Sequence, residues 1–208
     1  FNLSLIAISA PIVVIAINRF VFNIVYSRAL WFGVLVATIG VMVLISRGDI
    51  NALTKMNFSI GDLLMFVAAT SWGIYTATLE HKQPREFTQI EFLALITTIG
   101  LLILIPVFYW QVKSYGFSQY SSDNMAMILY LGIFPSVISF YSWNKSIEKI
   151  GATKTGATYY FIPVFVFIYS SILLDEKITY TEMLSFLLIF SGLLTINFTR
   201  SNQPTSAH

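Results

Sequence analysis

Seven hydrophobic segments follow one another along this chain of 208 residues, and each is long enough to cross a lipid bilayer. A helix needs about 20 predominantly apolar residues to span the hydrocarbon core of a membrane. The composition agrees, because 56% of the residues are hydrophobic and only 11% are charged. The expected helices run over Leu3–Phe22, Ala29–Ser46, Asp62–Leu79, Glu91–Val112, Met125–Trp143, Ala157–Leu174 and Tyr180–Phe198.

The fold class follows from the chemistry of the bilayer. Every backbone polar group in hydrocarbon needs a partner within the protein, so only helices and closed barrels span membranes. A barrel requires strands of about 10 residues with alternating polarity, and the run from Phe92 to Phe108 does not alternate. The gaps between the apolar segments are too short for a soluble domain. We therefore predict an all-α integral membrane protein with about seven transmembrane helices, and the lipid bilayer as its partner.

Several function classes are excluded by composition. A net charge of +2 is too small to indicate a nucleic-acid partner. The chain has no cysteine, which removes disulfides and thiolate metal sites. Its two histidines, His81 and His208, are far apart, so we predict no metal centre and no cofactor. No acid–base or metal-ligating cluster falls within the expected helices, and an enzyme is therefore not expected. The sequence does not indicate an oligomeric state.

The Lys and Arg residues beside the expected helices predict the orientation. Eight fall on the side where the first helix ends and four on the opposite side. Because cytoplasmic loops carry the excess of positive charge, the C-terminus and the polar tail over residues 199–208 are predicted to be cytoplasmic. An odd number of helices then leaves Phe1 outside, which is an unusual start without a signal sequence. Further helices upstream are therefore expected.

A weak internal repeat links the two ends of the chain. Pro11 and Pro163 lie 152 residues apart, and so do Gly40 and Gly192. Five membrane crossings separate the copies, which would give them opposite orientations, as in the inverted-topology repeats of transporters. Residues 1–48 are then the last two helices of a first repeat, and residues 60–198 are a complete second repeat of five helices. The alternative is chance identity among apolar helices.

The order of landmarks between Leu129 and Asn197 is more specific. A glycine-containing helix ends in aromatic residues, a Gly-Ala turn follows, and then come a helix with a proline, an acidic turn and a closing helix with a glycine. The landmarks are Gly132, Tyr141, Trp143, Gly151, Ala152, Pro163, Glu176 and Gly192. This order resembles the EamA family of the drug/metabolite transporter superfamily. Asp175 departs from the family, which usually has glycine before the glutamate.

The resemblance implies a ten-helix carrier, of which the first three helices would precede Phe1. It also implies a central cavity between two inverted repeats and export of small metabolites or drug-like solutes across the bacterial cytoplasmic membrane. We accordingly expect a secondary transporter that works by alternating access. The alternative is a truncated, non-transporting membrane remnant or scaffold.

No Asp, Glu or Lys lies near the middle of an expected helix. Intramembrane ionisable residues are the usual proton relays and ion sites of transporters. Coupling would therefore depend on upstream helices, or transport would be facilitated or by exchange.

Polar and aromatic side chains gather on four of the expected helices, which by resemblance to the family border the cavity. Aromatic walls with a few hydroxyl and amide groups suit amphipathic organic solutes, although Trp and Tyr also form belts at the membrane surface. The candidate substrate-binding residues are Trp72, Tyr75, Thr76, Ser139, Asn144, Thr158, Tyr159 and Ser9.

Further residues are predicted to have structural or gating roles. Pro11 and Pro163 remove backbone hydrogen bonds inside their helices, which either leaves a carbonyl free for substrate or bending, or makes a static kink. Gly192 is expected to permit close helix packing, as is Gly132. Glu176 either caps a helix or locks its turn, or it lies in a solvated loop.

Overall fold

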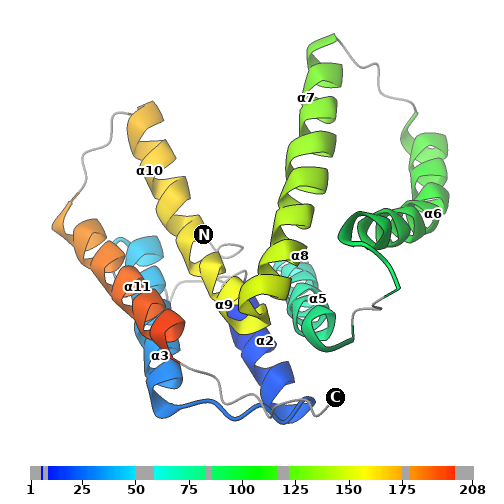
Figure 1. Cartoon of the computed structure of the whole chain (residues 1–208). Coiled ribbons are helices and arrows are strands. Elements are labelled where there is room, and N and C mark those ends of the chain that lie inside the picture. The colour runs from blue at the N-terminus through cyan, green and yellow to red at the C-terminus, as the bar shows by residue number, and fades with distance from the viewer. Residues whose placement is uncertain are drawn as a thin grey trace. The chain divides into compact units, whose positions relative to one another are not determined.

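The computed structural model describes Ile6 and residues 9–49, 59–82, 86–116, 122–174 and 179–199. All of its elements within these residues are helices (Figure 1). In chain order they are α2 (Ser9–Phe20), α3 (Arg28–Ser46), α5 (Ile60–Lys82), α6 (Gln89–Tyr115), α7 (Ser122–Ile133), the π-helix η1 (Phe134–Ile138), α8 (Ser139–Ile150), α9 (Ala152–Ala157), the 3-10 helix η2 (Thr158–Phe161), α10 (Ile162–Leu174) and α11 (Tyr180–Phe198).

Among the described residues, six helical segments are long and apolar enough to cross a membrane. One of them is continuous through α7, η1 and α8, and another through α9, η2 and α10. The helix expected over Leu3–Phe22 is represented by α2, whose 12 residues fall short of a full span. The prediction of an all-α membrane protein is thus confirmed.

Most boundaries of the later helices agree with the sequence prediction within three residues, but two differ by five or more. The fifth helix was expected to end at Trp143 but continues to Ile150, and the sixth begins at Ala152 rather than Ala157. The polar stretch after Trp143 is helical because it is amphipathic: Asn144 and Ile147 are buried while charged residues lie outside. Hydropathy alone detects the apolar part of such a helix and misses its polar end.

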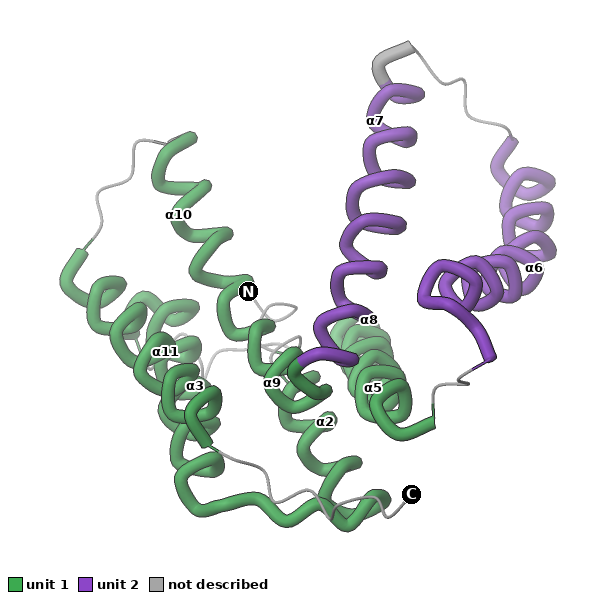
Figure 2. The backbone as a smooth tube through the Cα atoms, viewed as in Figure 1, with its two compact units in different colours: residues 1–82, 150–208 green, residues 83–149 purple. Residues whose placement is uncertain are grey.

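The chain divides into two compact units (Figure 2). Residues 1–82 and 150–208 form the first unit, and residues 83–149 form the second. In the first unit, α3 packs along α11, α2 packs along α5, and α9 contacts both α2 and α5. The buried core of this unit includes Ile15, Leu30, Val34, Ala37, Val41, Leu44, Tyr160, Ile189 and Ile196.

Glycines determine how closely α3 and α11 approach. A Cβ atom added to Gly192 would lie 2.6 Å from the backbone nitrogen of Ala37 and 2.6 Å from the carbonyl oxygen of Gly33. A Cβ on Gly40 would lie 2.8 Å from the backbone nitrogen of Ile189. Without side chains between them the two backbones can touch, which is the usual way in which membrane helices gain packing energy. Gly192 thus lies where two backbones meet, whereas Gly132 has no described atom within 4 Å of its Cβ position.

In the second unit, α6 and α7 are covered by exposed apolar side chains, and Leu93 is the one buried residue that α6 contributes. Such faces suit a hydrocarbon surrounding. The start of α6 is closed by a capping box, in which the Thr88 hydroxyl accepts from the Glu91 backbone N–H at 3.3 Å and the Glu91 carboxylate accepts from the Thr88 N–H at 2.7 Å. Glu91 therefore opens its helix, as expected from the sequence.

Proline explains the π-helix of the second unit. Pro135 has no N–H to donate to the carbonyl of Leu131, four residues earlier. The Ser136 hydroxyl donates to that carbonyl instead, at 3.0 Å. The backbone then widens by one residue, so that the Ser139 N–H donates to the carbonyl of Phe134. The long helix thus continues through the proline, with the carbonyls of Leu131 and Phe134 both accepting hydrogen bonds.

Candidate functional site

Three aromatic residues predicted to bind substrate lie together in the first unit. Trp72 and Tyr75 on α5 have ring centroids 5.4 Å apart, and the Trp72 ring lies 6.3 Å from that of Tyr159 on η2. All three side chains are half-buried. We call this set the aromatic wall. It arises because α5 and η2, distant in sequence, belong to the same compact unit.

The hydroxyl residues near these segments differ in exposure. Thr76 is fully buried on α5, whereas Thr158 on η2 is exposed. The Thr158 hydroxyl donates to the Thr155 carbonyl at 2.7 Å, and the Ser9 hydroxyl donates to the Ile6 carbonyl at 2.6 Å. Each hydroxyl thus donates its proton to a backbone carbonyl three residues earlier, and the lone pairs of its oxygen can still accept hydrogen bonds.

Ser139 and Asn144 belong to the second unit and are described within it. Ser139 is exposed, and its hydroxyl donates to the carbonyl of Phe134 at 3.1 Å. Asn144 is buried on α8. The assignment of both residues to substrate binding stays a prediction.

The predicted structural residues have specific surroundings. Pro11 is buried in α2. Pro163 cannot donate to the carbonyl of Tyr159, but the chain tightens into η2 and the Ile162 N–H donates to this carbonyl instead. The carbonyl that the sequence predicted to be freed by Pro163 is therefore occupied, because a 3-10 turn shortens the hydrogen bond by one residue. Glu176 lies outside the described residues.

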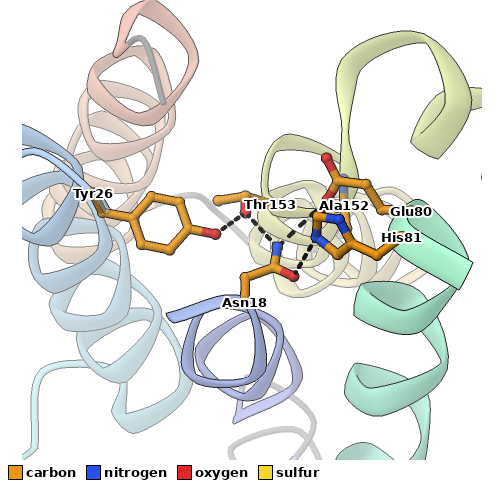
Figure 3. Close-up of polar contacts among 6 residues, drawn as sticks. All are labelled: Asn18, Tyr26, Glu80, His81, Ala152 and Thr153. Carbon is orange, nitrogen blue, oxygen red and sulfur yellow. Dashed lines mark hydrogen bonds and ion pairs between the residues drawn. The ribbon is translucent and has the colours of Figure 1, made fainter. Parts of the chain in front are cut away.

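Sequence reasoning missed a polar cluster at one end of the first unit (Figure 3). Asn18 near the end of α2 is 1% exposed and lies at its centre. Its amide nitrogen donates to the Thr153 hydroxyl at 3.2 Å and to Glu80 Oε2 at 3.4 Å. Its amide oxygen lies 3.2 Å from His81 Nε2. We call the residues of Figure 3 the α2–α5–α9 cluster.

Glu80 and Tyr26 extend the cluster in two directions. The backbone N–H of Ala152, the first residue of α9, donates to Glu80 Oε2 at 3.0 Å. A carboxylate at a helix N-terminus is stabilised by the unpaired N–H groups and the helix dipole. On the other side, the Tyr26 and Thr153 hydroxyls are 2.7 Å apart. Burial raises the pKa of Tyr26, which precedes α3 in the connection from α2, and its phenol therefore keeps its proton at neutral pH.

A small cavity of about 30 Å³ lies beside this cluster, and Asn18, Tyr26, Glu80 and Thr153 are among its lining residues. Pockets for drug-sized ligands are roughly ten times larger or more. A volume of this size holds about two water molecules. Among the described residues, no group of three His, Asp or Glu side chains is placed to hold a metal ion.

Part of the cluster was visible in the sequence. Asn18 is an amide within an apolar helix, and Glu80 and His81 are adjacent ionisable residues at the end of another. Polar groups in such positions require partners, which marks them as members of a network. Their partner Thr153 is 135 residues from Asn18, and no local pattern connects the two.

Several known proteins that are similar to this chain are named as transporters. It is 28% identical over 163 residues to the uncharacterized transporter YyaM of Bacillus subtilis, covering 78% of this chain and 53% of that protein. It is 24% identical over 134 residues to a probable terminal-alkyne amino-acid exporter of Streptantibioticus cattleyicolor, covering 64% and 44%. The chain spans about half the length of the curated relatives it matches.

A solved crystal structure has the same fold, with a TM-score of 0.69 at 16% sequence identity; the match covers 93% of this chain and 66% of the other. The relatives' names indicate transport rather than catalysis. Residues 59–198 match the EamA-like transporter family, which is about two thirds of the chain. This protein is therefore an integral membrane protein of the EamA-like transporter family.

Proposed function

We propose that this protein is a secondary transporter that exports small organic solutes, and that the aromatic wall is part of its substrate site. The observation that carries the site is the meeting of Trp72, Tyr75 and Tyr159 from two distant segments. Half-buried aromatic rings offer a large apolar surface at low entropy cost. The exporter from Streptantibioticus cattleyicolor supports small amphipathic solutes as the substrate class.

Alternating access between inverted repeats is the proposed mechanism. The contacts between α3 and α11 support it, because a contact between these helices has an equivalent contact between the residues that lie 152 positions away in the repeat. Gly40 contacts Ile189, and the residues equivalent to these two, Gly192 and Ala37, also contact one another. A two-fold relation between the helices would produce this pairing. The two repeats would rock about this seam and expose the substrate site to each side of the membrane in turn.

Polar residues are also proposed as part of the substrate site. Thr158 lies next to the aromatic wall in sequence and exposes an oxygen that can accept a hydrogen bond from substrate. Ser9 and Thr76 are the other proposed residues of the first unit, and Ser139 and Asn144 are proposed substrate-binding residues of the second unit. The family resemblance supports the bacterial cytoplasmic membrane as the location, and the distribution of Lys and Arg supports a C-terminus that faces the cytoplasm.

Efflux from cells producing the protein, measured with a panel of labelled amino acids and small aromatic compounds, tests the proposal. Trp72→Ala should reduce efflux about three- to tenfold, since an aromatic contact is worth roughly a kcal/mol. Trp110→Ala is the matched control, because Trp110 is 62% exposed on α6 and pairs with Tyr115. Its efflux should match the wild type at equal protein level.

Two results would contradict the proposal. Equal efflux from the Trp72 and Trp110 variants would remove the aromatic wall from the substrate site. Absence of efflux of every compound from the wild-type protein would favour the non-transporting alternative.

A further inference from the structure

The α2–α5–α9 cluster joins segments that belong to different expected repeats. Asn18 and Tyr26 lie within residues 1–48, whereas Glu80, His81 and Thr153 lie within residues 60–198. The hydrogen bonds from Asn18 to Glu80 and Thr153, from His81 to Asn18, and between Tyr26 and Thr153 all cross this division. All of them lie where α2 and α5 end and α9 begins.

The backbone conformation at Gly151 permits the contact between Glu80 and the start of α9. Gly151, between α8 and α9, has a φ of 86° and a ψ of 159°, a conformation almost restricted to glycine. A Cβ atom there would lie 2.9 Å from Glu80 Oε1. Glycine thus lets the carboxylate reach the first N–H of α9, where it serves as the helix cap that α9 lacks from its own residues.

The contact made by the α2–α5–α9 cluster differs in kind from the contact between α3 and α11. The seam at Gly192 is made of touching backbones and apolar side chains, which cannot separate without losing their packing. The cluster is made of hydrogen bonds beside a cavity of about 30 Å³ with polar groups on its wall. Water can replace such bonds at a net cost of about 1 kcal/mol each, so this contact can open and close reversibly.

We propose that the α2–α5–α9 cluster is a latch that closes one end of the transport path, and that Asn18 and Glu80 are gating residues. This inference rests on the proposed function. In the described conformation the latch is closed, because its hydrogen bonds are formed. The predicted topology places it at the cytoplasmic end. Export then requires the latch to break so that substrate can enter.

Accessibility of a single cysteine tests the latch without any measurement of transport. The chain has no cysteine of its own. Leu30 lines the cavity and is 2% exposed, so Leu30→Cys reports opening when inside-out vesicles are treated with a membrane-impermeant maleimide. Thr153→Val keeps the side-chain shape and removes the hydroxyl that bonds Asn18 and Tyr26. It should raise the labelling rate about thirtyfold, as expected when two hydrogen bonds of about 1 kcal/mol each are lost.

Two further variants make the test decisive. Asn18→Leu should raise labelling at least as much, and if it fails to fold, Thr153→Val alone decides. Thr98→Val is the matched control, because its hydroxyl donates to the Ala94 carbonyl on the exposed face of α6. A labelling rate in Thr153→Val within twofold of its parent, or an equal rise in Thr98→Val, would overturn the latch. Labelling from the outer side alone would overturn its cytoplasmic placement.

The same experiment separates the latch from the transport proposal. If labelling responds as expected but no solute is exported, the latch stands and the proposed function fails. If export depends on Trp72 while labelling is unchanged, the proposed function stands and the latch fails.

Discussion

The seam between α3 and α11 gives the sharpest prediction of stability. Replacing Gly192 with Ala adds one methyl group where a Cβ atom would lie 2.6 Å from two backbone atoms. This distance is 0.4 Å below the 3.0 Å that real Cβ contacts respect. The obstacles are the nitrogen of Ala37 and the oxygen of Gly33, and neither can rotate away as a side chain would. The helices must therefore separate along the seam.

The cost of this separation can be estimated. A gap of 0.5–1 Å forfeits a quarter to a half of each van der Waals contact, and overpacking a core typically costs about 1–3 kcal/mol. For a protein of this size such a loss lowers Tm by about 3–10 °C. Thermal unfolding of the purified protein in detergent, followed by tryptophan fluorescence, measures the change in Tm.

Gly132→Ala is the control, because glycine at this α7 position has no described atom within 4 Å of the added methyl. Alanine should leave Tm unchanged or raise it slightly, since glycine in a helix interior is unfavourable by roughly 0.5–1 kcal/mol relative to alanine. A Tm of Gly192→Ala within 2 °C of the Gly132→Ala variant would contradict the prediction and show that the two backbones are not in contact. A difference of 2 °C corresponds to about half a kcal/mol.

Two other variants test local features. Glu182→Ala should lower the free energy of unfolding by about 1–2 kcal/mol, because the buried carboxylate caps α11 by accepting hydrogen bonds from the Thr179 N–H and hydroxyl. Glu91→Ala removes the exposed cap of α6 and should lower stability less in the same thermal assay. Tyr26 has a raised pKa in the folded protein, so the unfolded chain loses the phenol proton first and stability falls as pH rises above about 10. Tyr26→Phe should flatten this fall in Tm between pH 8 and 11, and an unchanged slope would contradict the assignment.

Hydropathy along the sequence predicted helix boundaries well where a helix is apolar on all sides. The segments over Ala29–Ser46 and Tyr180–Phe198 agree with α3 and α11 within one residue, because these helices are apolar around their whole circumference. The prediction stopped short at Trp143 because α8 is amphipathic and continues as a helix through charged residues. The π-helix at Pro135 escaped detection, since it depends on which group takes the place of the missing N–H.

Part of the candidate site was predicted from the sequence, and the tertiary structure decided the rest. The sequence identified Trp72, Tyr75 and Tyr159 by residue type, and the structure brought their rings together. Asn18 and Glu80 were not singled out from the sequence, and no local pattern pairs them with one another or with Thr153.

The sequence by itself determined the membrane class of this protein, its helical elements and the family to which it belongs, because each depends on composition and order along the chain. Only the tertiary structure decided which glycines touch a neighbouring backbone and which polar groups gather at one end of the first unit. These properties depend on distances of a few ångströms between residues more than a hundred positions apart, as for Asn18 and Thr153. Such distances are set by packing, and no local pattern encodes them.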